Sequence, residues 1–60
     1  MTQLQILRYA YNGLLEVWGR EYDRLQDHPD NEITKARFEK YDNELNELRT
    51  MLIAEEQKEQ

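Results

Sequence analysis

The chain has no cysteine, one proline and two glycines in 60 residues. Without cysteine it can form neither disulfides nor thiolate zinc sites, which stabilise many very small domains. A chain of this length buries only about 60% of the surface that its unfolded form exposes, so the core of a monomer would be marginal. Self-association is the remaining means of stabilisation, and we expect a single unit over residues 1–60 that forms a homodimer.

Long apolar runs are also missing. No stretch approaches the roughly 20 apolar residues that are needed to cross a bilayer. Met1 is not followed by a basic stretch and an apolar run of signal-peptide length. We therefore expect a cytoplasmic protein that has no membrane partner.

Positive charge is scarce relative to negative charge. Acidic residues outnumber basic ones by 13 to 8, which gives a formal net charge of −5. Nonspecific contacts with phosphate groups depend on clustered Lys and Arg side chains. The balance therefore argues against nucleic acids and anionic membranes as partners.

Helix-forming residues dominate what remains, and two similar helix starts divide the chain. Thr2 followed by Gln5 is a capping box, in which each side chain bonds a free amide of the other residue. At Thr34 the flanking apolar residues recur but the box is incomplete, and we place the second helix start there. Asn31 is a rival cap that would lengthen this helix by one turn.

A polar turn containing Pro29 separates the two starts, because proline removes a backbone donor and disfavours helical geometry at the preceding residue. The sequence predicts helices over about 2–27 and 34–57, joined by a turn at 28–33. A short link makes consecutive helices antiparallel neighbours. The expected fold is all-α, an antiparallel two-helix hairpin that dimerises into a four-helix bundle.

Apolar residues recur at spacings of three and four along both predicted helices, which defines one seam on each helix. The two seams should face each other, with Leu15 and Tyr22 widening the first. The predicted core of the hairpin consists of Leu4, Leu7, Tyr11, Leu14, Trp18, Leu25, Phe38, Tyr41, Leu45, Leu48 and Leu52.

A second apolar stripe runs along the first helix, displaced from its seam, at Ile6, Ala10, Gly13 and Val17. One partner helix cannot cover both stripes. A glycine in a helix interior costs about 1 kcal/mol relative to alanine, so Gly13 suggests close approach by another helix backbone. We predict that these four residues form the dimer interface.

The sequence offers no arrangement typical of catalysis. His28 is the single histidine, and although it lies beside Asp27 and Asp30, a metal site needs three or four converging ligands. Paired Glu-x-x-His motifs, a positioned nucleophile and a glycine-rich phosphate loop are all missing. We expect no enzyme, no catalytic or metal-binding residues and no cofactor.

In layout, with two helices and a short turn in about 60 residues, the chain resembles the plasmid-copy-number RNA-binding hairpins of the Rop type. The resemblance implies a dimeric four-helix bundle that binds paired RNA loops through a polar helix face. Residues near Arg8, Tyr9, Arg20 and Arg24 would then contact RNA.

The charge balance favours another hypothesis, a small interaction or regulatory protein whose acidic helix faces dock a protein partner. A third alternative is acidic mimicry of nucleic acid, which rests on the net charge alone.

Overall fold

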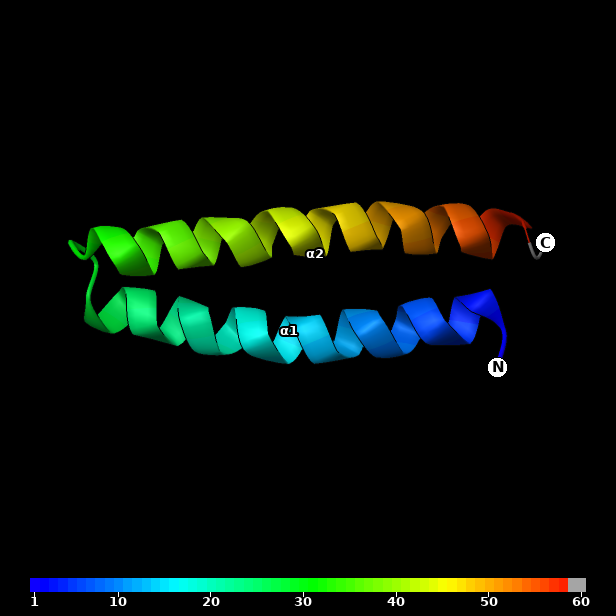
Figure 1. Cartoon of the computed structure of the whole chain (residues 1–60), viewed down its shortest axis with the longest axis horizontal. Helices are drawn as coiled ribbons and strands as arrows, with labels where there is room; N and C mark the ends of the chain where they lie inside the picture. Colours follow the sequence, from blue (N-terminus) through cyan, green and yellow to red (C-terminus); the bar gives the residue numbers. More distant parts are fainter. Residues whose placement is uncertain (59–60) are drawn as a thin grey trace.

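The computed structural model describes residues 1–58, which form two antiparallel helices joined by a short turn (Figure 1). Helix α1 spans Gln3–Asp27 and helix α2 spans Glu32–Lys58. The helices lie side by side in a rod with extents of 44 × 16 × 13 Å, and the start of α1 and the end of α2 lie at the same end of the rod. The prediction of an all-α antiparallel hairpin is confirmed.

Helix α1 begins as the capping box predicts. The Thr2 hydroxyl accepts a hydrogen bond from the Gln5 amide (3.2 Å), and the Gln5 side chain accepts one from the Thr2 amide (2.9 Å). Thr2 itself is extended and is the cap, so the helix proper begins one residue later than predicted, at Gln3. The helix ends at Asp27, where the His28 amide donates to the Arg24 carbonyl (2.9 Å) and Pro29 follows.

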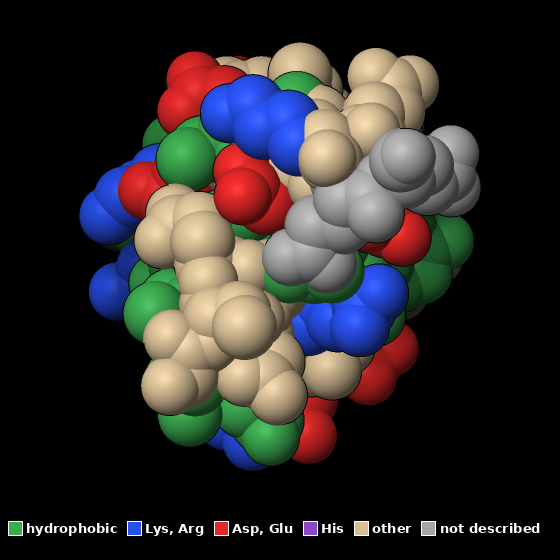
Figure 2. Space-filling view, turned by 90° about the vertical axis from the view of Figure 1, so that its right-hand side faces the viewer, with side chains coloured by type: hydrophobic (Ala, Val, Ile, Leu, Met, Phe, Trp, Pro, Cys, Tyr) green, Lys and Arg blue, Asp and Glu red, His purple; other side chains and the backbone are tan. Residues whose placement is uncertain are grey.

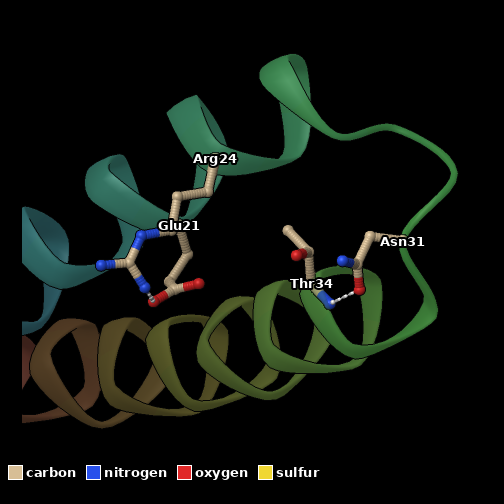
Figure 3. Close-up of polar contacts among 4 residues, drawn as sticks. All are labelled: Glu21, Arg24, Asn31 and Thr34. Atoms are coloured by element: carbon tan, nitrogen blue, oxygen red, sulfur yellow. Dashed lines mark hydrogen bonds and ion pairs between the residues drawn. The ribbon is translucent and has the colours of Figure 1, made fainter.

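The predicted start of α2 at Thr34 is wrong, because the helix begins at Glu32 with Asn31 before it. The Asn31 side-chain oxygen accepts hydrogen bonds from the amides of Ile33 (2.9 Å) and Thr34 (3.1 Å), as Figure 3 shows for Thr34. One short side chain thus satisfies two of the free amides of the first turn, including that of Thr34. The turn is correspondingly shorter than the predicted 28–33, and α2 also extends one residue further, to Lys58.

This cap is open to a direct test. Replacing Asn31 with alanine should lower the free energy of unfolding by about 1 kcal/mol, because two amides lose their acceptor. Chemical denaturation followed by circular dichroism measures the change. Thr34→Ala is the matched control, since its side chain does not cap the helix, and a larger loss for Thr34→Ala than for Asn31→Ala would contradict the assignment.

The seams face each other, but the hairpin covers them incompletely. Leu4 and Leu7 are buried, at 7% and 6% exposure, and no side chain within residues 1–58 is fully buried. Leu15 and Tyr22, expected to widen the seam, remain 41% and 43% exposed. The other residues of the predicted core are partly buried: Tyr11, Leu14, Trp18, Leu25, Phe38, Tyr41, Leu45, Leu48 and Leu52. Viewed end-on, hydrophobic side chains reach the surface between charged ones on several sides (Figure 2).

An aromatic cluster joins the two helices near the turn. The rings of Trp18, Tyr22 and Phe38 lie with centroids 5.5 to 5.9 Å apart, a spacing at which aromatic pairs attract each other. The Trp18 indole also donates a hydrogen bond to the Asp42 carboxylate (3.2 Å). These contacts set the second half of α1 beside the first half of α2.

Candidate association surface

The seam divides the surface of the hairpin into two broad faces, and its spacing of three and four residues also passes through Glu21, Thr34 and Glu55. Arg8, Asp42 and Glu56 each follow a seam position, and they make the contacts that cross between the helices on one face. The Arg8 guanidinium lies 3.8 Å from the Glu56 carboxylate, and Asp42 accepts the bond from Trp18. We call this the paired face, which also carries Leu15, Gly19, Tyr22, Lys35 and Arg49, because each of these residues follows a seam position too.

Residues that precede a seam position lie on the opposite face. Since the helices are antiparallel, the preceding rows of α1 and α2 turn toward the same side of the hairpin. We call this side the open face. It is formed by Ile6, Ala10, Gly13, Val17, Arg20 and Arg24 of α1 and by Ile33, Arg37, Lys40, Glu44, Glu47 and Met51 of α2.

The predicted dimer interface is the apolar part of the open face. Ile6 is 47% exposed, Ala10 and Gly13 are exposed, and Val17 is partly buried. A Cβ atom built on Gly13 would meet no heavy atom within 4 Å. The hairpin itself therefore makes no close approach at Gly13, and the prediction of such an approach concerns a second molecule.

The α2 row of the open face has an ordered pattern of charge that analysis of the apolar periodicity missed. Its outer members, Ile33 and Met51, are 69% and 53% exposed. Between them lie two exposed basic residues, Arg37 and Lys40, and then two exposed acidic ones, Glu44 and Glu47. None of these four side chains belongs to the ion pairs formed within residues 1–58. The sign of the charge at positions preceding the seam was the signal that could have revealed the row.

Glu21 was also missed by the sequence analysis. It occupies a seam position between Trp18 and Leu25 and is only 7% exposed. One carboxylate oxygen accepts a hydrogen bond from Arg24 (3.3 Å), whereas the buried Oε2 has no hydrogen-bond partner in the described part of the chain (Figure 3). A buried charge with incomplete pairing weakens a core. The predicted core contains no residue between Trp18 and Leu25, although the apolar spacing places a seam position at 21. This gap was the signal that could have revealed Glu21.

The four residues named for RNA binding do not share one face. Arg8 lies on the paired face and contacts Glu56, while Arg20 and Arg24 precede seam positions and belong to the open face. Tyr9 is 64% exposed and belongs to neither row. The structure therefore divides the basic side chains that a Rop-like reading would place on one RNA-binding surface.

The candidate metal ligand considered in the sequence, His28, lies in the turn between α1 and α2. It is exposed there, and the described side chains include no group of three or more that could hold a metal ion. These residues enclose no pocket. Neither α1 nor α2 is both long and apolar enough to span a membrane.

Comparison of the chain with family models, curated proteins and solved structures finds no match. The function proposed below is therefore inferred from the surfaces of the chain itself.

Proposed function

We propose that this chain is a small, non-enzymatic interaction or regulatory protein that acts as a homodimer, in which two hairpins form a four-helix bundle that docks a protein partner. The observation that carries the proposal is the apolar stripe of the open face, which the hairpin leaves uncovered around Ile6 and Gly13. Burial of apolar surface is the main favourable term in protein association. A second hairpin laid on this face supplies the cover that one chain lacks.

The net charge of the protein indicates the charge of the partner surface that it would bind. The exposed residues Glu16 and Asp23 lie on α1 away from both the seam and the open face, so they stay on the outside when the open faces of two hairpins meet. Two copies together carry twice the formal charge of −5. Acidic helix faces attract a protein surface that carries Lys and Arg side chains, and salt screens this attraction.

Light scattering tests the dimer directly. We expect a molar mass of twice the 7.4 kDa chain mass at low micromolar concentration. A stable monomer at that concentration would overturn the proposal.

Capture of proteins from the native host with the dimer as bait tests docking, and we expect the captured protein to be released as the salt concentration is raised. Capture that is insensitive to salt would refute acidic docking.

Gly13 provides a sharper test of where the dimer forms. Gly13→Leu should weaken dimerisation by about tenfold or more, because overpacking a close contact between helices costs about 1 to 3 kcal/mol. Within one hairpin the added side chain meets open space, so folding should tolerate it. Sedimentation equilibrium measures the dissociation constant of the dimer.

Gly19→Leu is the matched control for this measurement. A Cβ atom at Gly19 also meets no heavy atom within 4 Å, but Gly19 follows the seam residue Trp18 and lies on the paired face. The control should dimerise as the unmodified chain does. Equal dimer affinity for Gly13→Leu and the unmodified chain would mean that the apolar stripe has another use.

A further inference from the structure

We propose that the second hairpin packs antiparallel on the open face, about a twofold axis that passes α2 at the level of Asp42, so that α2 lies against α2 of the second copy. This inference rests on the proposed homodimer and adds the orientation and register of its two chains.

The inference comes from the α2 row of the open face, which is complementary to itself when reversed. Lys40 and Glu44 lie two residues on either side of position 42, and Arg37 and Glu47 lie five residues on either side. Ile33 and Met51 lie nine residues away in each direction. A twofold interface brings each residue against its counterpart on the other side of the axis. Each charged residue of the row therefore faces a residue of opposite charge. At the two ends of the row, Ile33 and Met51 face each other and both are apolar.

A parallel arrangement in register would have the opposite effect. The twofold axis would then run along the rod and lay α2 against α1 of the second copy. At the level set by the bond from Trp18 to Asp42, Lys40 and Arg37 would face Arg20 and Arg24 of that copy. Like charges in direct opposition are destabilising. The order of the charges along α2 thus selects the antiparallel arrangement, while the apolar stripe supplies the attraction.

The absence of ion pairs at these four charges within the described part of one hairpin agrees with this role. Arg37, Lys40, Glu44 and Glu47 are exposed and take part in no ion pair within residues 1–58. Exposed ion pairs contribute little to affinity individually, but an arrangement of complementary charges excludes wrong registers. We therefore infer that the charge row sets the register of the dimer and contributes little to its affinity.

The α1 half of the open face fits the same axis. The bond from Trp18 to Asp42 places Val17 near the level of the axis. Antiparallel packing of α1 about that point sets the small residues Ala10 and Gly13 opposite Arg20 and Arg24 of the second copy, whose aliphatic stems cover the apolar stripe while their charged ends reach water. Small residues opposite large ones allow two helices to interdigitate, which gives Gly13 a steric role.

Two double variants test the charge row. Arg37→Glu/Lys40→Glu makes the row wholly acidic, and Glu44→Lys/Glu47→Lys makes it wholly basic. Each variant alone should self-associate about tenfold more weakly than the unmodified chain at low ionic strength, because four like-charge contacts replace four attractive ones. Mixed in equal amounts, the two variants should form a heterodimer with nearly the affinity of the unmodified homodimer, as measured by sedimentation equilibrium.

The matched control places the same charge change on the paired face. Lys35→Glu/Arg49→Glu also replaces two basic side chains with acidic ones, and both residues follow seam positions. It should dimerise as the unmodified chain does and should show no preference for the basic-row variant beyond that of the unmodified chain.

Orientation is measured independently by attaching one spin label to each chain. The protein has no cysteine, so His28→Cys in the exposed turn provides a unique attachment site. The ten residues of α2 from Glu32, at the turn, to position 42 rise about 15 Å, so in the antiparallel dimer the two labels should lie about 30 Å apart or more. Parallel hairpins would bring the labels within about 20 Å of each other.

The outcomes separate this inference from the proposed function. A normal dimer mass with a short distance between labels, or with no heterodimer preference, would overturn the antiparallel register and leave the homodimer standing. A monomeric unmodified chain would overturn both. A dimer with the long distance and the heterodimer preference supports both.

Discussion

Replacing Phe38 with alanine should lower the free energy of unfolding by about 3 kcal/mol, the lower end of the range for removing a core aromatic ring. We expect the lower end because Phe38 is partly rather than fully buried. The change removes the ring that contacts both Trp18 and Tyr22 across the helices. In a domain of this size such a loss lowers the melting temperature by more than about 10 °C. Thermal denaturation followed by circular dichroism measures the shift.

Tyr9→Ala is the control for this prediction. Tyr9 is 64% exposed and lies off the seam, so removal of its ring should change the free energy of unfolding by no more than about 0.5 kcal/mol. Similar losses for Tyr9→Ala and Phe38→Ala would mean that the aromatic cluster does not hold the helices together.

Replacing Glu21 with leucine should raise the free energy of unfolding by about 1 to 4 kcal/mol. The substitution exchanges an incompletely paired buried carboxylate for an apolar side chain at a seam position, a change that is neutral or stabilising in other cores. Arg24 loses its partner but stays 60% exposed at its side chain, so water solvates it at little cost. Urea denaturation of the variant and the unmodified chain measures the difference.

Glu21→Gln separates charge from shape. It keeps the size and a hydrogen-bond acceptor for Arg24 but removes the charge, so its stability should lie between those of the unmodified chain and Glu21→Leu. A fall in stability for Glu21→Leu would contradict the prediction and would mean that the carboxylate has a partner outside its own hairpin.

The pairing of the helices could be predicted because several local signals agree. The Thr2–Gln5 box, the break at Pro29 and the apolar spacing of three and four residues each point to the same two elements. The start of α2 could not be placed as well, since Asn31 and Thr34 are both good caps and lie three residues apart. Bonding decides between them, because the Asn31 side chain reaches two amides in the folded turn.

The candidate surface was predictable only in its apolar half. Ile6, Ala10, Gly13 and Val17 stand out by hydrophobicity, whereas the charge row of α2 looks like ordinary solvated helix until the seam defines which side it faces. Glu21 was missed for a related reason. A carboxylate at a seam position is expected to turn outward, and only the packed structure shows it enclosed.

The two ends of the described chain leave the rod together, beside the Arg8–Glu56 ion pair, while the turn lies at the far end (Figure 1). Any polypeptide attached before Thr2 and any attached after Lys58 would therefore start from neighbouring points. The hairpin can therefore extend outward from a larger assembly while both of its attachment points stay close together. Its turn then extends about 40 Å from that base, given the rise of an α-helix over the length of α2.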